Sequence, residues 1–294
     1  LKLTEGTKAI NKIMNNKKEK TMRTLTIICS SLLLFVCSAR SQRICIEVNS
    51  GLQGLRYKLE NGDSKPQFGG RIGASYHQPL NKNWKLLSGI AGEFYSTRAT
   101  LKNGVVFTSD EVDQVGSAFK YNVTPQDYEE TQRFYAVGVP LKLQYEHEGK
   151  TRWYVNAGFR FIFPFMAKFK ASAKEMTVSG YYPDYDIEVK SMPQHGFGTI
   201  ANWKDEGTQV LNPALATSAG AGMSFMLTEK LQLYTGVYFD YGLTNMRSDN
   251  RQHPYLAEYN PTNVNNTQAA GVINISEARL LAYGVQFIIA LPYD

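Results

Sequence analysis

The residue types that most often perform chemistry are few and scattered in this chain of 294 residues. Its four histidines are His77, His147, His195 and His253. None lies two or four positions from another and none has a cysteine partner, so the sequence predicts no metal site and no cofactor. A hydrolase needs a serine, a histidine and an acid brought together, and His195 or His253 is a candidate for that histidine. Because no nucleophile motif accompanies them, we expect a protein that is not an enzyme.

A second group of ionisable residues shares one property: each lies on a face that otherwise carries glycine, alanine and serine. The group holds three acids and three bases, which are Glu47, Arg71, Glu93, Lys142, Arg160 and Asp240. Charges in an enclosed interior are tolerated when they are paired. We therefore expect a network of ion pairs across a narrow interior, and a proton or ion path is the alternative.

The elements that must position these side chains are β-strands. From Trp153 to Lys168 the odd positions are bulky and apolar, whereas the even positions include Asn156, Gly158 and Arg160. Successive side chains of a strand point to opposite faces, so one face carries bulky apolar side chains and the other carries small or charged ones. A soluble sandwich would place Lys, Glu and Thr on its second face. The small face instead suits the crowded lumen of a narrow barrel, with the bulky face against lipid.

The same alternation recurs in about eight segments. They are 43–58, 67–79, 83–97, 131–146, 151–168, 213–227, 230–243 and 278–292. Tight turns join some of them, at 80–82, 148–150 and 228–230; a modest connection spans 59–66, and long ones span 98–130, 169–212 and 244–277. Outer-membrane barrels have short periplasmic turns and longer outer loops. The predicted fold is therefore all-β: a transmembrane antiparallel up-and-down β-barrel of about eight strands, too narrow for an open diffusion pore.

Some details of the strands stay open. Pro140 and Pro164 fall inside predicted strands, where the missing N–H removes a ladder hydrogen bond, so we expect a bulge or an early strand end at each. The segments 105–107 and 175–178 could extend hairpins above the membrane or add a strand pair.

The start of the chain resembles an export signal. Residues 22–41 have a charged start, an apolar run at 25–36 and an Ala39-Arg40-Ser41 end, which predicts a signal peptide cleaved near Ser41 and Gln42. Residues 1–21 are a Lys-rich extension that we expect not to be native or translated, and 42–294 form the barrel domain. Acylation at Cys37, as in a lipoprotein, is the alternative. Cleavage leaves Cys45 as the only cysteine, so no disulfide is possible within the mature chain.

The charge of the chain lies in this leader. The formal net charge is +6, but residues 1–41 contain eight Lys and Arg and two Asp and Glu, so the remainder is neutral. A nucleic-acid partner therefore has no electrostatic basis.

Aromatic residues suggest two surfaces. Trp84, Tyr145, Trp153 and Tyr293 lie beside the short turns and the chain end, and we expect them to form a periplasmic aromatic girdle in contact with outer-membrane lipid. The loop 169–212 is rich in aromatic residues and is a candidate surface for a protein partner; the alternative is a lid that packs on itself. Its candidate contact residues are Tyr181, Tyr182, Tyr185, Phe197 and Trp203. The Asn- and Thr-rich loop 244–277 is expected to be solvated.

Three segments carry a family resemblance. Residues 135–145 read YAVGVPLKLQY, residues 154–158 read YVNAG, and residues 236–245 read GVYFDYGLTN. They are similar to the "IPL-x-LKY", "Y-x-x-x-G" and "Y-x-x-GL-x-N" strands of PorT-like and OmpA-like outer-membrane barrels of Bacteroidetes-type bacteria. The resemblance implies a small barrel in the outer membrane of a Gram-negative cell, and some members serve type IX protein secretion. Val139 and Gln144 depart from the pattern.

Together these features predict a non-enzymatic outer-membrane barrel with a structural or partner-binding role, in a secretion or surface assembly, whose long loops or periplasmic face bind the partner. One rival is a transporter for small hydrophobic molecules, as in OmpW-like barrels, which requires an apolar lumen and a lateral opening. Under the ion-pair model, by contrast, Arg160→Ala creates a leak. The second rival is a lipid or peptide hydrolase at the rim, which uses His195 or His253.

Overall fold

A computed structural model describes residues 43–149, 151–228, 231–248 and 255–291. The predicted extension 1–21 and signal peptide 22–41 lie outside these residues, as do His253 and Tyr293. The statements made about them above stay predictions.

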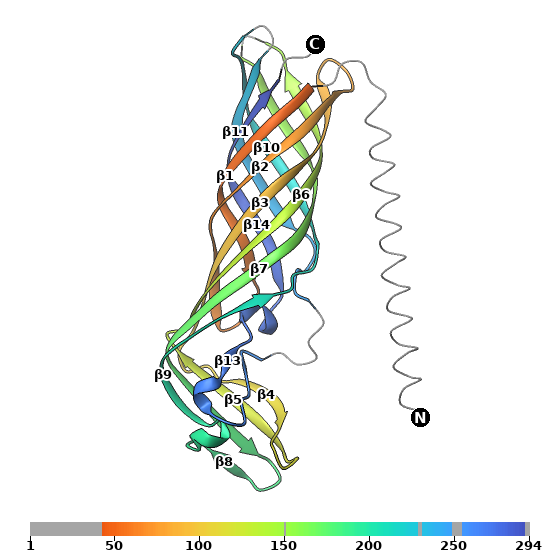
Figure 1. The fold of residues 1–294 in the computed structure, drawn as a ribbon. Helices are drawn as coiled ribbons and strands as arrows, with labels where there is room; N and C mark the ends of the chain where they lie inside the picture. Colours follow the sequence, from red (N-terminus) through yellow and green to blue (C-terminus); the bar gives the residue numbers. More distant parts are fainter. Residues whose placement is uncertain (1–42, 150, 229–230, 249–254, 292–294) are drawn as a thin grey trace, which may run out of the picture. The chain divides into compact units, whose positions relative to one another are not determined.

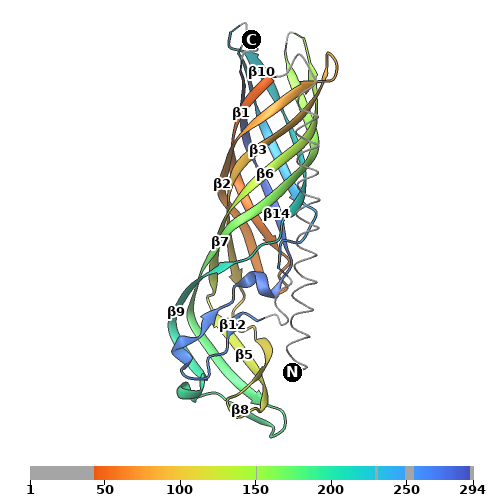
Figure 2. The same cartoon turned by 45° about the vertical axis from the view of Figure 1, so that its right-hand side comes forward.

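Eight strands form a closed antiparallel ring, which confirms the predicted fold class (Figures 1 and 2). They are β1 (Arg43–Tyr57), β2 (Gly62–Pro79), β3 (Trp84–Leu101), β6 (Glu129–His147), β7 (Trp153–Tyr182), β10 (Ala214–Met226), β11 (Gln232–Gly242) and β14 (Ala278–Ala290). Consecutive ring strands pair with each other, and the ring closes where the first strand, β1, pairs with the last, β14, from Cys45 opposite Ala290 to Tyr57 opposite Ala278. Each strand overlaps one of the eight predicted segments.

The two ends of the ring differ in their connections. At one end, here called the short-turn end, brief turns join β2 to β3, β6 to β7 and β10 to β11. The first and last strands also meet there, since the Leu291 N–H donates to the Ile44 carbonyl over 2.9 Å. At the other end, the long-loop end, residues 58–61 join β1 to β2, and the other three connections run far beyond the ring (Figure 1).

The long connections 98–130 and 169–212 build an extension of the sheet, so they are not loops throughout, and the alternative of a hairpin extended above the membrane is confirmed for 175–178. The strands β4 (Phe107–Val112) and β5 (Ala118–Gln126) form a hairpin, and β5 pairs with the far part of β7. On the other side of β7 lie β8 (Ile187–Val189) and β9 (Gly198–Gln209). A short helix, η1 (Pro193–His195), separates these two strands. These strands carry polar side chains because they lie beyond the ring, where water replaces lipid.

The described part of the connection from β11 to β14 packs against the extension and, through η3, against the open end of the ring, so it is not the solvated loop that was expected. It contains β12 (Ala257–Glu258), β13 (Gln268–Ala269) and the helices η2 (Val264–Asn266) and η3 (Val272–Ile275). Val264, Val272 and Ile273 from this segment are buried. We call 255–277 the cap.

The two prolines within the ring behave differently. Beside Pro164 the β6–β7 register shifts by one residue between Tyr135 and Ala136, which leaves Phe165 as the extra residue of a bulge, as predicted. At Pro140 no bulge forms. The β3–β6 pairing is instead interrupted between Leu141 and Gly138 and resumes in the same register, because only one ladder hydrogen bond is missing there.

The alternation seen in the sequence separates the two faces of the ring. Outward side chains form an apolar band that includes Ile46, Ile72, Ile90, Val155, Phe161, Val237, Phe239, Val285 and Phe287, all exposed. Among the described residues there is no helix with the length and apolar character needed to cross a membrane.

Inward glycines provide room for large lumen side chains. A Cβ atom on Gly236 would lie 2.7 Å from the Tyr154 hydroxyl, and one on Gly222 would lie 2.8 Å from it. These two glycines face each other on β10 and β11, and Tyr154 reaches them from β7. The glycines of the inward face therefore provide the space that large lumen side chains such as Tyr154 occupy.

Candidate functional site

The lumen holds the charged residues predicted from the sequence, and Arg71 on β2 forms the first ion pair across it. Its guanidinium donates to Oδ2 of Asp240 on β11, and both side chains are fully buried. Oδ1 of Asp240 accepts from the Ser218 hydroxyl on β10. The Arg71 guanidinium also lies 4.1 Å from the ring centre of Tyr238, in a cation–π contact. The cation thus has a partner on one side and an aromatic face on the other.

Arg160 on β7 joins two acids from the opposite side of the lumen. Its Nε donates to Oε1 of Glu93 over 2.7 Å, and its Nη2 lies 3.8 Å from Oε1 of Glu47. The Tyr95 hydroxyl donates to Oε2 of Glu93 over 2.5 Å. A Cβ atom at Gly138 would collide with the Glu93 carboxylate, so this position on β6 leaves space for the pair. We call these residues and those around Arg71 the ion-pair layer.

Lys142 differs from the expectation that all six charges would be paired. It is buried in the lumen, but within the part of the chain that the structure describes its ammonium makes no ion pair or hydrogen bond. Asp240 on β11 accepts instead from Arg71 and Ser218. Lys142 still balances the formal charge of the layer, which has three acids and three bases.

A second polar network fills the lumen near the short-turn end, and the sequence analysis missed it. Glu146 on β6 accepts from Lys85 over 2.5 Å, from Gln232 over 2.8 Å, from Tyr234 over 3.1 Å and from Ser224 over 3.2 Å. Glu146 has the same strand parity as Lys142, and Lys85 the same parity as Glu93. This alternation could have identified both residues as lumen side chains, but both lie close to the ends of their strands.

Neutral side chains link the two networks. The Gln286 amide donates to the Tyr154 hydroxyl over 2.9 Å, and Asn156 donates to Gln144 over 3.5 Å. The lumen is therefore polar from the short-turn end to the ion-pair layer, and it is filled by side chains from every part of the ring.

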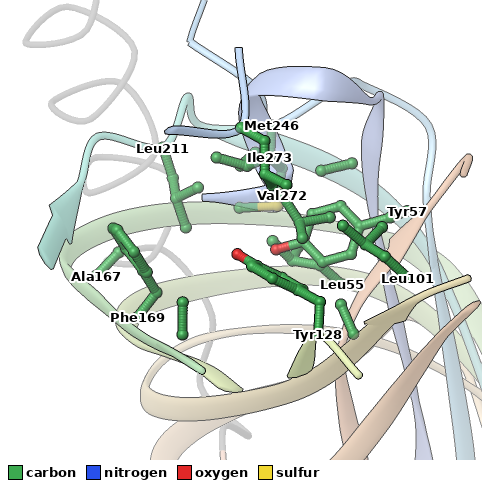
Figure 3. Close-up of a cluster of buried hydrophobic side chains, with 14 of the residues drawn as sticks. Leu55, Tyr57, Leu101, Tyr128, Ala167, Phe169, Leu211, Met246, Val272 and Ile273 are labelled. Atoms are coloured by element: carbon green, nitrogen blue, oxygen red, sulfur yellow. The ribbon is translucent and has the colours of Figure 1, made fainter. Parts of the chain in front are cut away.

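Above the ion-pair layer, at the long-loop end, the character of the interior changes to apolar. Figure 3 shows a cluster in which cap residues meet side chains from the ring. It includes Leu55, Tyr57, Leu101, Tyr128, Ala167, Phe169, Leu211, Met246, Val272 and Ile273, all buried. The cap thereby covers the mouth of the lumen with a dry layer.

One acid lies beneath the cap. Glu130 is buried at the start of β6, five residues beyond Tyr135, the last apolar outward residue of that strand, and so outside the apolar band. Its Oε2 accepts from the Val272 N–H and from the Tyr128 hydroxyl, each over 2.8 Å. Burial is the main cause that raises the pKa of Glu130 to about 7, and the two hydrogen bonds oppose it. The carboxyl therefore changes its charge near neutral pH.

The histidines do not come together. His77 is buried beside the Ser75 hydroxyl, 3.3 Å away, His147 stacks on Trp153 with ring centres 5.5 Å apart, and His195 lies in η1. The described residues contain no group of three His, Cys, Asp or Glu side chains that could hold a metal ion.

The predicted girdle residues lie together at the short-turn end. The ring centres of Trp84 and Tyr145 are 5.2 Å apart, and those of Tyr145 and Trp153 are 5.5 Å apart. Both tryptophans are partly exposed on the outward face.

The predicted partner-contact residues divide into two sets. Phe197 and Trp203 are buried: Phe197 packs on Phe119, and the Trp203 indole donates to the Thr267 carbonyl over 3.1 Å. The prediction that these two residues contact a partner is therefore wrong. They support the extension from inside, because burial of an apolar ring stabilises the fold more than exposure does. Tyr181, Tyr182 and Tyr185 remain accessible, and Tyr185 is 64% exposed.

Comparison with known proteins finds one matching family model. It is described as "Outer membrane protein beta-barrel domain" and matches residues 38–248. No curated protein matches the chain.

Several solved structures are similar to this chain. Neisserial surface protein A is 9% identical with a TM-score of 0.32, covering 86% of this chain and 100% of that one. OprG from Pseudomonas aeruginosa is 9% identical with a TM-score of 0.33, covering 85% and 91%. Ail of Yersinia pestis is 11% identical with a TM-score of 0.25, covering 84% and 99%.

Removing the central arginine should destabilise the ring. Arg160→Ala leaves the Glu93 carboxylate buried and without its cation, which costs about 3–5 kcal/mol. The matched control is Arg98→Ala, whose exposed pair with Glu129 contributes about 0–1 kcal/mol. Urea titrations of the purified protein in detergent measure the loss of stability in both variants. The heat-dependent gel shift of the folded barrel is the readout of each titration. Equal losses for the two variants would contradict the ion-pair layer.

The contact between the cap and Glu130 should weaken as the pH rises. The pKa of Glu130 in the closed cap is above its ordinary value, so the stabilisation is complete below about pH 4.5 and is lost as the pH rises to about 7. The loss amounts to roughly 3 kcal/mol, or on the order of 100-fold in hydrogen-exchange protection of the Val272 amide.

The measurement compares that protection in the wild type and in Glu130→Gln at each pH, which removes the intrinsic pH dependence of exchange. The control is Glu129→Gln, since Glu129 is partly exposed and lies next to Glu130 in the sequence. A wild type whose protection follows that of Glu130→Gln from pH 5 to pH 8 would exclude the titration of Glu130.

Proposed function

We propose a function for this chain from the premise that it belongs to the outer membrane protein β-barrel domain family: it is a non-conducting outer-membrane protein that presents its extension to a partner outside the cell. The chain lies in the outer membrane, with the apolar band against lipid. Short turns face the periplasm in such barrels, so the long-loop end and the extension face outward.

The observation that carries the proposal is the closure of the lumen at two levels. The ion-pair layer places Arg71 with Asp240 and Arg160 with Glu93 in the interior, all four side chains buried. The cap adds an apolar layer above them. A ring of eight strands leaves space for side chains or one small ligand, and here side chains occupy it.

The same observation counts against the rival transporter. A path for small hydrophobic molecules requires an apolar lumen, whereas the ion-pair layer and the Glu146 network place charged side chains across the lumen at two levels. An apolar solute in this lumen would separate buried ions from their partners, which is costly. We therefore propose no transport function.

We also propose that the protein is not an enzyme. Of the two candidate histidines, His253 lies outside the described residues. The side chain of His195 makes no hydrogen bond within the part of the chain that the structure describes, so no acid among those residues orients it. A nucleophile–histidine–acid arrangement needs such contacts.

The tip of the extension is the surface that suits a partner. Val112 and Val115 at the β4–β5 turn and Tyr185 and Ile187 at the β7–β8 turn are exposed, and Val115 is 86% exposed. The Tyr182 hydroxyl donates to Oδ2 of Asp113 over 3.2 Å, so the two turns are held together (Figure 1). We call these four residues the tip patch. Exposed aromatic and aliphatic side chains on a rigid support are typical of contact surfaces.

The PorT-like motifs of the sequence support a finer proposal. They suggest a barrel of the Bacteroidetes type and a partner within a surface or secretion assembly, with the type IX system as the specific candidate.

Opening the barrel to ions should require two changes. The cap provides a second closure that the sequence did not reveal, so Arg160→Ala alone should not create the leak expected from the ion-pair layer. We expect no steady ion current in planar bilayers from the wild type, from Arg160→Ala or from Val272→Asp/Ile273→Asp, and a current from their combination. Val115→Asp on the tip patch is the matched control for added charge. A steady current from the folded wild type would overturn the proposal.

Partner contact at the tip patch can be tested in living cells. A photoreactive amino acid placed at Val115 or Tyr185 should give a discrete crosslinked product, because both side chains project from the tip. The control position is Thr208 on β9, which is exposed but lies away from the tip. Products of equal yield from all three positions, or none from the tip, would refute the proposed contact surface.

A further inference from the structure

Three cross-strand pairs of basic residues lie on the outward face of the sheet at the long-loop end. In the antiparallel register Arg56 on β1 is opposite Arg279 on β14, Lys65 on β2 is opposite Arg98 on β3, and Arg133 on β6 is opposite Lys168 on β7. Arg279 is half-buried and the other five are exposed. We call these six residues the basic rim.

The basic rim follows directly after the apolar band. On β6 Tyr135 is the last exposed apolar residue, and Arg133 is the next outward residue beyond it. The same step leads from Met166 to Lys168 on β7. On β3, Arg98 comes four residues after Phe94. Each basic pair therefore lies at the level where lipid chains end and head groups begin.

Such pairs are unfavourable without an anion. Like charges directly opposite each other in a sheet destabilise it. Acids relieve only part of this charge: Glu129 lies 2.8 Å from Arg98, and Glu277 lies 3.7 Å from Arg279. Among the residues that the structure describes, Arg56, Lys65, Arg133 and Lys168 make no ion pair.

One pair also borders a pocket. A hollow of about 620 Å³ is lined by Arg56, Lys58 and Arg279, together with Asp63, Tyr241 and Glu277. Arginine forms two parallel hydrogen bonds to a phosphate, and two neighbouring bases can share one. The hollow thus has the size and the donors for a phosphorylated head group, although its two acids reduce its net charge.

We propose that the basic rim binds the phosphate groups of a phosphorylated glycolipid in the outer leaflet of the membrane. The lipid source, rather than free phosphate, follows from position: an anion held at each pair has the apolar band beside it, where acyl chains pack on Tyr135 and Met166. The pairs are also spread over six strands of the ring, as a surrounding leaflet requires. The proposal depends on the outer-membrane location but not on the non-conducting, partner-binding function proposed above.

The test uses the purified chain in detergent, with phosphorylated lipid A added as the probe. Native mass spectrometry counts the lipid A molecules retained by the wild type, Arg56→Gln/Arg279→Gln and Arg133→Gln/Lys168→Gln. Each basic residue near an anionic surface contributes a factor of about 5 to affinity, so lipid A should bind roughly 30-fold more weakly at the pair that each double variant removes, and each variant should retain fewer lipid A molecules. The matched control is Lys120→Gln/Lys204→Gln, which removes two exposed bases from the extension.

A second readout separates lipid binding from folding. The repulsion within each pair is present without lipid, so in neutral detergent the double variants should melt at the same temperature as the wild type or higher. Lipid A should raise the melting temperature of the wild type more than that of either double variant, because each variant keeps two of the three pairs.

Three outcomes would overturn the proposal: equal retention by all variants, an equal loss in the Lys120 and Lys204 control, or retention that dephosphorylated lipid A matches. Stabilisation of the wild type by inorganic phosphate as strong as that by lipid A would assign the rim to a free anion instead. Conductance and tip crosslinking should be unchanged in the rim variants, so failure here is distinguishable from failure of the proposed function.

Discussion

The narrow interior of an eight-stranded ring receives every second side chain of every strand, and the rest of the structure depends on how that interior is filled. A buried charge in this space costs free energy unless it is paired, so a cation there is stabilised where it meets an acid or an aromatic face. Arg160 between Glu93 and Glu47 satisfies this condition, as does Arg71 between Asp240 and Tyr238. Glycine is then required at positions such as Gly138 and Gly236, because a larger side chain there would collide with the side chains that fill the lumen. The filled ring supports the extension and the cap.

The strands of the ring could be predicted because lipid and lumen select different residue types on alternate positions. Outside the membrane that contrast disappears. The segment 107–112 reads Phe-Thr-Ser-Asp-Glu-Val, which resembles a loop, and it is a strand because β5 pairs with it and β7 pairs with β5. Pro164 marks a bulge as predicted, whereas at Pro140 the ladder absorbs the missing hydrogen bond. Local sequence does not distinguish these two outcomes.

The candidate site was predicted in its composition but not in its contacts. Strand parity places all six charged residues inside the ring, but which acid meets which base depends on how far neighbouring strands are staggered. Lys142 is left without a partner for that reason. The contact of Glu130 with Val272 joins residues far apart in the chain, and Val272 comes from a segment whose polar composition suggested a solvated loop. Phe197 and Trp203 show the reverse case, since aromatic residues that suggested a contact surface are buried in the extension.

Strand β7, Trp153–Tyr182, forms part of the ring and also the centre of the extension, with β5 and β9 on either side. Its first part pairs with β6 and β10 inside the ring. One backbone therefore passes from the ring into the extension without a break. The extension thus has no hinge of its own along this strand, and the ladder of hydrogen bonds that seals the barrel also holds the extension in place.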